Sequence, residues 1–473
     1  MMSSAPFGEG TSDAPPGAGF PDAAGDDEVA PRRSSNAPLA VHPAVGFALP
    51  ADWITLGPPA PRPDPRPGPR ASTEEPIGGV LKQRPEDFIV EELPAYDPCG
   101  EGEHLYLGIR KMNMPHTEML AVLCRHFKVD EGAIGFAGMK DRVAVTQQTV
   151  SVQVPAAREI GELRHDRLAV LWAMRHKNKL RRGHLRGNRF AIRIREVDPM
   201  KVRLVKRRME DLAARGAPDY FGEQRFGYRV NNQLLGQLFA RREWQRILDE
   251  LLGARGTPFP PHQLAVREAY DRGEFAAAAD LWGRHDQAER IALRALARGR
   301  DAEGAVRAIP QHMKAFWMSA LQGAVYNATL AARIADGTYA TVLPGDVARL
   351  CASSSVFSIP GDIDAAALAV ERARCERLEI TAAGPIHGPS MVAATGEALR
   401  YETAALAAFG AEESMFAPPA LEAEGARRPF RIEVRNWEID AGVDEHGGYI
   451  RLLFDLPKGA FATVLCREIM GEA

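Results

Sequence analysis

The chain has 473 residues, of which 26% are charged and 45% are hydrophobic, and its formal net charge at pH 7 is −3. These values are ordinary for a soluble globular protein of two or three domains, and the net charge gives no sign of a nucleic-acid partner. The five cysteines lie far apart and contain no CxxC pair. They argue against a disulfide framework or a cysteine-rich zinc site, and they favour a reducing, cytoplasmic location without a membrane segment.

The first part of the chain is rich in proline. Residues 1–70 hold 15 of the 35 prolines, including the run PPAPRPDPRPGPR from Pro58 to Arg70. Such a segment has too little apolar content to offset its ordering entropy. We therefore predict a disordered or polyproline-like extension over residues 1–74, with a docking role as the alternative. Residues 1–70 are expected to be dispensable for folding and activity.

Order is predicted to begin near Gly78, and the next elements follow from hydrophobic periodicity. Strands are predicted where apolar and polar residues alternate: residues 105–110, 150–154, 190–195, 430–435 and 451–456, with strand-like pieces at 353–359. In the first of these, Leu105, Leu107 and Ile109 are expected to face inward and Tyr106 outward.

Helices are predicted between these strands. Thr117 is expected to cap a helix that carries Met119, Leu120, Leu123 and Phe127 on one face. Asp198 and Pro199 are expected to open a second helix that ends at Gly216. Residues 231–402 are largely helical in period and rich in alanine. Strand-rich ends around a helix-rich middle indicate an α+β core with one domain inserted into another.

Several common enzyme classes lack a local motif. The stretch GFAGMKD, residues 135–141, resembles a phosphate-binding loop but lacks the Gly-Lys-Ser/Thr triplet. No HExxH, GxSxG or GxGxxG occurs, and the twelve histidines show no metal-ligand spacing. Hydrolase, NTPase and dehydrogenase functions therefore have no support in the sequence.

A dense basic segment indicates a partner. Between Arg175 and Arg208 there are fourteen lysines and arginines against two acidic residues, Glu196 and Asp198. Positive charge beside glycines is typical of a phosphate-binding surface, although a charge run can also be a solvated face.

A candidate reactive group lies upstream of this segment. Asp141 falls in a tight turn within GMKDRVAVTQQ, between Lys140 and Arg142. Neighbouring cations favour the ionised form that a nucleophile or base requires, although an aspartate in a turn is often only a turn former.

Eight segments resemble, in order, the motifs of the TruD family of tRNA pseudouridine synthases. They are KQRPEDFIVEE (82–92), GEGEHL (100–105), GMKDRVAVTQQ (138–148), HKNKLRRGHLRGNRF (176–190), APDYFGEQRFG (217–227), GPIHG (384–388), RRPFRIE (427–433) and LPKGAFATVLCRE (456–468). The last segment has Ala460-Phe461 where the family commonly has Ser-Tyr, which is a conservative departure. The resemblance runs from Gly78 to Ile469 and leaves the N-terminal extension outside.

The resemblance implies a fold and a division into domains. It implies a pseudouridine-synthase catalytic domain with a mixed or antiparallel sheet, over residues 75–222 and 404–473. This domain would be interrupted by a helix-rich TRUD insertion over residues 223–403, with RNA bound between the two.

The resemblance also implies the reaction. Uridine would be isomerised to pseudouridine, at position 13 in the D-arm of tRNA, by cleavage of the glycosidic bond, rotation of the base and closure through carbon 5. The family's catalytic aspartate corresponds to Asp141, which would attack the sugar or the base or remove a ribose proton. No cofactor, metal, membrane or obligate protein partner is implied. The alternative is a non-catalytic protein that binds or folds RNA on the same scaffold.

The target uracil would have to leave the base stack and enter a pocket. The resemblance places Phe190 at the wall of that pocket, with Asn188 nearby, although Phe190 also belongs to an apolar strand face. Lys140 would orient Asp141 or contact a phosphate. For Glu86, Asp87 and Phe88 a structural role and a pocket role are equally expected, whereas Phe221 and Phe226 are expected in the core. The other expected pocket or RNA-binding residues are Lys82, Glu86, Phe88, Arg142, His176, Lys179 and Arg225.

Overall fold

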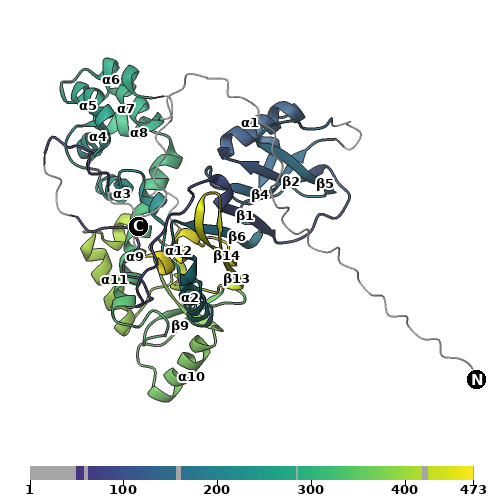
Figure 1. Cartoon of the computed structure of the whole chain (residues 1–473). Helices are drawn as coiled ribbons and strands as arrows, with labels where there is room; N and C mark the ends of the chain where they lie inside the picture. The colour runs from purple at the N-terminus through teal and green to yellow at the C-terminus, as the bar shows by residue number, and fades with distance from the viewer. Residues whose placement is uncertain (1–48, 58–61, 156–160, 284–285, 418–423, 472–473) are drawn as a thin grey trace, which may run out of the picture. The chain divides into compact units, whose positions relative to one another are not determined.

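The computed structural model describes residues 49–57, 62–155, 161–283, 286–417 and 424–471 (Figure 1). The prediction of a disordered segment over residues 1–48 lies outside this part of the chain. The described strands are β1 (Phe88–Pro94), β2 (His104–Met112), β3 (Ile134–Phe136), β4 (Val145–Gln153), β5 (Leu168–His176), β6 (Leu185–Arg195), β7 (Ala217–Pro218), β8 (Val347–Leu350), β9 (Val356–Ser358), β10 (Ile380–Ile386), β11 (Ala426–Pro429), β12 (Arg431–Ile432), β13 (Arg435–Asp444) and β14 (Gly447–Pro457).

The helices cluster in the middle of the chain, as the alanine-rich periodicity predicts. They are α1 (His116–Phe127), α2 (Val202–Arg215), α3 (Asn232–Ala240), α4 (Trp244–Leu252), α5 (Leu264–Asp271), α6 (Phe275–Leu281), α7 (Gln287–Ala297), α8 (Ala302–Ala308), α9 (Gln311–Ala335), α10 (Ala365–Glu376), α11 (Gly396–Ala408) and α12 (Ala462–Met470). Within the described residues no helix is both long and apolar enough to cross a membrane.

An eight-stranded mixed sheet forms the centre of the fold. Its strand order is β13-β14-β6-β1-β4-β2-β5, and β3 pairs with β4 beside β1. Strands β1 and β4 run parallel, and the other pairs are antiparallel. The predicted α+β class with a mixed sheet is confirmed.

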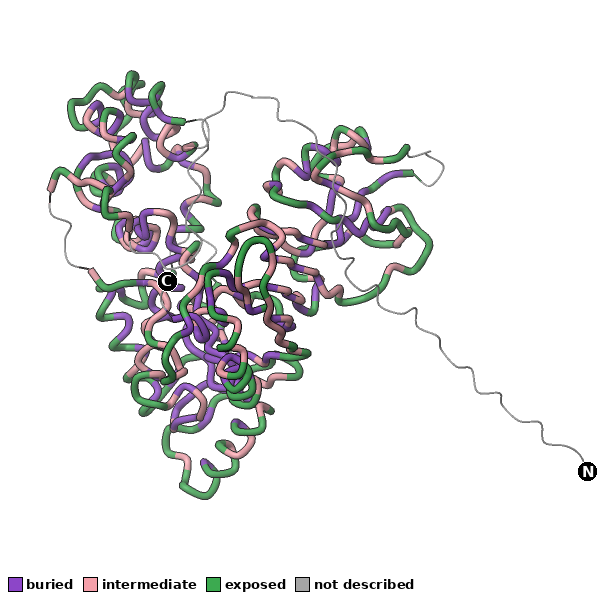
Figure 2. The backbone as a smooth tube through the Cα atoms, in the orientation of Figure 1, coloured by how far each residue is buried: buried purple, intermediate pink, exposed green. Residues whose placement is uncertain are grey.

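Two groups of helices cover this sheet. Helix α1 packs on β2, β4 and β5 through the residues Met119, Leu120, Leu123 and Phe127, as the periodicity predicts. Helices α2 and α12 pack on β6, β13 and β14, where the tube is largely coloured as buried (Figure 2). The loop that carries Asp141 follows β3. Strand β1 pairs with the first residues of β4, at 145–147, and β3 pairs with later residues, at 150–152.

Two local predictions need correction. Thr117 does not cap α1, because the helix already begins at His116 and its N-cap position is Pro115. Tyr106 does not face solvent, since only 1% of it is exposed. Its hydroxyl donates to the carbonyl of Asn178 at 3.1 Å, so a second layer of chain covers the face that alternation alone assigns to water.

The start of α2 follows the prediction. The side chain of Asp198 accepts a hydrogen bond from the backbone N–H of Met200 at 2.9 Å, and a short 3-10 turn at Pro199–Lys201 leads into α2. The helix ends at Gly216, whose φ of 83° is accessible to glycine without strain.

The helix-rich region contains its own small sheet of order β11-β10-β8-β9. Because β11 pairs with β10, and α11 runs across the expected boundary at residues 403/404, we propose that the chain returns to the domain of the eight-stranded sheet near residue 430. The pairing of β12 with β7, which precedes the insertion, supports this position.

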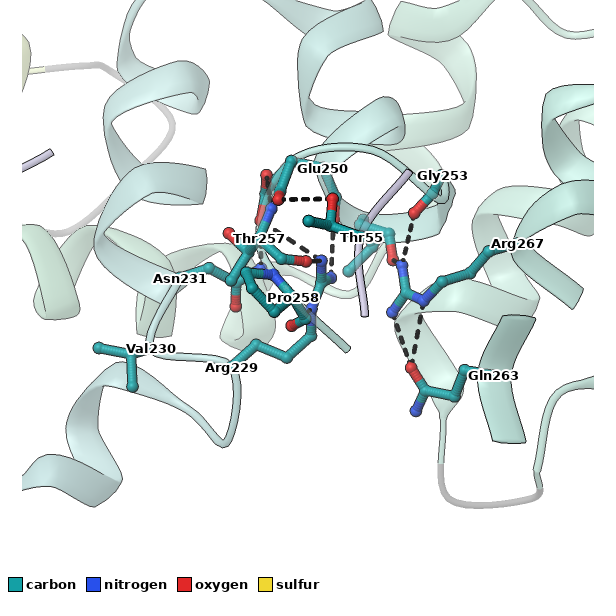
Figure 3. A network of polar contacts seen from close by, with 12 residues as sticks. Thr55, Arg229, Val230, Asn231, Glu250, Gly253, Thr257, Pro258, Gln263 and Arg267 are labelled. Carbon is teal, nitrogen blue, oxygen red and sulfur yellow. Dashed lines mark hydrogen bonds and ion pairs between the residues drawn. The ribbon is translucent and has the colours of Figure 1, made fainter. Parts of the chain in front are cut away.

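Two buried arginines stabilise the end of α4 (Figure 3). Arg229 donates to the carbonyl of Glu250 at 2.8 Å, and Arg267 donates to the carbonyls of Leu251 and Gly253 at 3.1 and 2.9 Å. The last carbonyls of a helix have no intrahelical partner and carry partial negative charge. The guanidinium groups donate hydrogen bonds to these carbonyls and place positive charge beside them, which explains why the two arginines are buried.

The described part of the N-terminal extension packs against the body, contrary to the prediction. We call residues 49–57 and 62–75 the N-terminal strap. Ile54 exchanges two backbone hydrogen bonds with Phe259, at 3.1 and 3.0 Å, and the Thr55 hydroxyl donates to Gly256 beside the Arg229 network (Figure 3). Trp53 lies edge-to-face against Tyr228 with 5.8 Å between ring centroids.

The second part of the strap contacts α9 and α12. Asn327 on α9 donates to the carbonyl of Pro65 at 2.9 Å, and the buried carboxylate of Glu468 on α12 accepts from the backbone N–H groups of Ala71 and Ser72 at 2.8 and 3.1 Å. The strap therefore contacts both the helix-rich region and the domain of the eight-stranded sheet.

Candidate active site

Asp141 lies in the loop between β3 and β4, and its carboxylate is paired with Lys82. Lys82 Nζ is 2.6 Å from Asp141 Oδ2, with 4% of the lysine side chain and 37% of the aspartate side chain exposed. Lys82 has a φ of 55°, which is uncommon for a residue with a side chain and costs backbone energy. A buried ammonium group needs a counter-ion. The pair thus fixes an ionised carboxylate that solvent and a substrate can reach.

Lys111 holds the backbone of this loop. Its ammonium group donates to the carbonyl oxygens of Asp141 and Met114, each at 2.8 Å, and its side chain is fully buried. Burial lowers the pKa of Lys111 to about 8, with the nearby Asp141 acting in the opposite direction. The sequence carried a signal for this residue. Lys111 continues the inward period of Leu105, Leu107 and Ile109, where a lysine requires a buried partner.

Lys140 does not pair with Asp141. Its Nζ lies 2.8 Å from Glu92 Oε2, and 7% and 2% of the two side chains are exposed. Glu92 also accepts from the backbone N–H of Thr149 at 3.3 Å. Glu92 is the last residue of the motif at residues 82–92, and no role was predicted for it. In the structure it ties the Asp141 loop, through Lys140, to strands β1 and β4.

The basic block at residues 176–190 lies against the same loop. The N–H of Gly183 donates to the carbonyl of Ala137 at 2.8 Å, and the N–H of Leu180 donates to Ser151 Oγ at 3.0 Å. A Cβ atom on Gly135 would lie 2.2 Å from the Leu180 carbonyl oxygen, so this crossing requires glycine. The basic block is therefore held against the loop that carries Asp141.

An aromatic layer lies below the Lys82–Asp141 pair. The Lys82 ammonium is 4.3 Å from the centroid of the Phe88 ring, which contacts Phe190 edge-to-face at 6.3 Å. Phe190 also stacks on Phe454 at 5.5 Å, and 6% of it is exposed. Phe88 and Phe190 are thus packed core residues beneath the pair.

Asn188 lies two residues before Phe190 on the same strand face, opposite Glu92. Its Oδ1 atom is buried and has no hydrogen-bond partner among the described residues. A buried acceptor without a donor is costly, which marks this atom as one that a ligand can satisfy.

The remaining predicted site residues differ in placement. Glu86 is half-buried and lies 3.6 Å from Arg84, whereas Asp87 is fully buried and pairs with Arg195 at 2.6 Å, so Asp87 is structural. Arg142 is exposed beside Asp141.

His176, Lys179 and Arg225 make contacts away from the carboxylate. His176 stacks on Tyr96 at 5.3 Å, and Lys179 donates to the Gly132 carbonyl at 2.5 Å. Arg225 donates to Ser319 at 2.5 Å, and burial lowers its pKa to about 10. Phe221 and Phe226 are core residues, as predicted.

One half-buried histidine near the loop, His116, was not predicted as a site residue. Both ring nitrogens of His116 are buried without a partner among the described residues, and its ring lies 4.4 Å from that of Phe136. Burial, reinforced by Lys111, Arg182 and Lys140, lowers the pKa of His116 to about 4. His116 is therefore neutral near pH 7, and the ionised carboxylate is the candidate reactive group. Over the described ranges no cluster of three His, Cys, Asp or Glu side chains could hold a metal ion.

The fold agrees with comparisons to known proteins. Residues 69–469 match the family described as tRNA pseudouridine synthase D (TruD). The chain is 38% identical over 395 residues to the tRNA pseudouridine synthase D of Geobacter metallireducens, covering 83% of this chain and 95% of the relative. It is 36% identical over 395 residues to that of an Anaeromyxobacter species, covering 83% and 93%.

A solved structure has the same fold. The crystal structure of a candidate tRNA pseudouridine synthase D from Methanosarcina mazei superimposes with a TM-score of 0.70 at 25% identity, over 86% of this chain and 98% of that chain. The α+β fold is therefore that of a pseudouridine synthase. The chain belongs to the TruD family of tRNA pseudouridine synthases, which are isomerases.

Proposed function

We propose that this chain isomerises uridine to pseudouridine at position 13 of tRNA, in the cytoplasm, with Asp141 as the essential carboxylate. The reaction moves the glycosidic bond of the base from N1 to C5. A proton leaves C5 and a proton is gained at N1, so atoms and electrons balance without an external reagent.

One observation carries the proposal. Asp141 is a partly exposed carboxylate with a buried lysine as its counter-ion, on a loop whose backbone Lys111 anchors. A fixed, ionised and accessible carboxylate suits each of three roles, which are attack on the sugar, attack on the base and removal of a ribose proton.

The polar surroundings suit a uracil base. Uracil carries one ring N–H donor at N3, and the buried Asn188 Oδ1 atom is an acceptor without a donor. We infer that a flipped uracil satisfies this atom. The Phe88–Phe190 layer supports the strand from below and keeps Asn188 in place, in contrast to the expected role of Phe190 as an open stacking wall.

The basic block is proposed to bind phosphates. Changing both Arg181 and Arg182 to alanine should weaken tRNA binding and reduce the slope of log affinity against log salt by roughly 1–2, because lost phosphate contacts release fewer counter-ions. Binding is measured by filter retention over a series of salt concentrations. Arg203 and Arg207 on α2 belong to the same basic segment and are equally exposed, so their double alanine variant is the matched control. Equal slopes of log affinity against log salt in the two variants would mean that the basic block is a solvated surface that does not contact phosphates.

Chemical or mass-spectrometric mapping of pseudouridine tests the proposed reaction. Purified chain and unmodified tRNA are incubated without any cofactor, and each position is read. Pseudouridine at position 13 supports the full proposal. Pseudouridine at another position would support the reaction but change the proposed target position. Tight tRNA binding without product at any position would favour the non-catalytic RNA-binding alternative.

A further inference from the structure

An exposed tryptophan on β5 lies flat against the neighbouring strand. A Cβ atom built on Gly108 of β2 would lie 2.1, 2.4 and 2.6 Å from Nε1, Cε2 and Cδ1 of Trp172. Such similar distances to three consecutive ring atoms require the indole to face Gly108 rather than meet it edge-on. The missing side chain at Gly108 thus makes room for the ring, which remains 42% exposed.

Trp172 also forms one wall of a pocket. The other lining residues include Tyr96, Tyr106, Leu180, His184 and Glu92. The Tyr96 hydroxyl lies 3.2 Å from that of Tyr106 and 3.0 Å from His184 Nδ1, which holds the Tyr96 ring in place although 38% of the residue is exposed. Two exposed aromatic side chains with constrained positions therefore border one pocket.

The pocket is connected to the candidate active site through Glu92. This carboxylate lines the pocket and pairs with Lys140, the residue immediately before Asp141. The basic block supplies two further lining residues, Leu180 and His184. A ligand in this pocket would lie beside the RNA that presents a uridine to Asp141.

The charges around the pocket favour a nucleobase rather than a phosphate as the group bound inside it. Glu92 and Asp97 line the pocket, and carboxylates repel phosphate. Cations lie outside it. Arg110 is exposed two residues beyond Gly108, and Arg186 is exposed where it donates to the carbonyl of Pro94 at 2.9 Å. Aromatic faces combined with flanking arginines are the usual means of binding unpaired nucleotides.

We propose that the pocket bordered by Tyr96 and Trp172 binds a second nucleobase of the RNA, one that flanks the uridine presented to Asp141. The base stacks on the outer face of the indole, and Arg110 and Arg186 contact adjacent phosphates. This inference rests on the proposed function, because it assumes that the ligand is the RNA substrate.

The test compares two neighbouring residues of β5. Leu171 is 45% exposed, lies next to Trp172 at the register shift between β2 and β5, and does not line the pocket, so Leu171→Ala is the matched control for Trp172→Ala. Trp172→Ala should raise KM for tRNA roughly 10-fold, the usual effect of losing one stacked base, with kcat within about twofold. Leu171→Ala should change neither value.

RNAs with an abasic site at single positions near the target identify the base. At one position, base removal should weaken wild-type binding as much as Trp172→Ala does, and the two changes together should add nothing further. Trp172→Phe should retain most of the affinity, whereas Trp172→Leu, which still covers Gly108, should lose it. An unchanged KM in Trp172→Ala, or full affinity in Trp172→Leu, would overturn the proposal.

Direct RNA binding separates this inference from the proposed reaction. If the wild type forms no pseudouridine, the abasic series is read by fluorescence anisotropy of labelled RNA. A position-specific loss shared with Trp172→Ala then still supports the nucleobase site. A uniform response to every abasic RNA rejects it, whatever the catalytic result.

Discussion

Replacement of Asp141 with asparagine should reduce kcat for pseudouridine formation by about 10⁴-fold or more, while tRNA binding stays within a few-fold of wild type. Asparagine keeps the size of the side chain and can still accept from Lys82, but it cannot act as an anionic nucleophile or base. Single-turnover formation of pseudouridine gives the rate, and filter binding gives the affinity.

The controls address the charge that the variant leaves behind. Lys82 is buried and loses its anionic partner, so thermal unfolding of the variant must be compared with that of the wild type. Asp166→Asn, at an exposed position before β5, provides a matched change from aspartate to asparagine. Turnover near the wild-type rate in folded Asp141→Asn would remove Asp141 from the mechanism.

Much of the fold was predictable from alternation and turn residues. The strands around Leu107, Val152 and Ile192 and the helix ending at Gly216 were expected, because each buries one regular face. Tyr106 was misplaced because alternation assumes that one face of a strand meets water. Here the segment that includes Asn178 covers that face, and a local pattern contains no information on such a covering.

Three members of the candidate site were predicted, but their pairings were not. Lys82, Lys140 and Asp141 all stood in motifs, yet flanking position suggested Lys140 as the partner of the aspartate. In the structure the lysine 59 positions earlier in the chain makes that contact, while Lys140 pairs with Glu92. Ion pairs depend on which strands are neighbours, and only the parallel pairing of β1 with β4 brings these segments together.

The N-terminal strap escaped prediction for a different reason. Its contacts use backbone groups and prolines rather than a periodic apolar face: the carbonyl of Pro65 accepts from Asn327, and that of Pro69 accepts from Tyr220 at 3.2 Å. A prediction from composition considers only the hydrophobicity of the side chains. It therefore does not detect a segment whose backbone carbonyls are fixed by donor side chains of the neighbouring helices and loops.

Removal of the strap should therefore destabilise the folded chain. A variant that begins at Pro76 loses the N–H donors that satisfy Glu468 and the acceptor that satisfies Asn327, and it uncovers Ala331, whose Cβ lies 2.5 Å from the position of a Cβ atom built on Gly68. We expect a loss of roughly 3–5 kcal/mol in the free energy of unfolding, since each buried group left unsatisfied costs about 1–3 kcal/mol.

The matched control begins at Leu49 and keeps every strap contact described above. Denaturant unfolding of the two variants measures the difference, and hydrogen exchange shows where it acts. Faster exchange in both α9 and α12 of the shorter variant would mean that the strap joins the helix-rich region to the catalytic domain. Equal stability and equal exchange in the two variants would return the strap to the dispensable extension that its composition suggests. The strap contacts both regions that are expected to enclose the RNA. If its removal loosens only one of these regions, the shorter variant should also bind tRNA more weakly, while its kcat at saturating tRNA stays at the wild-type value.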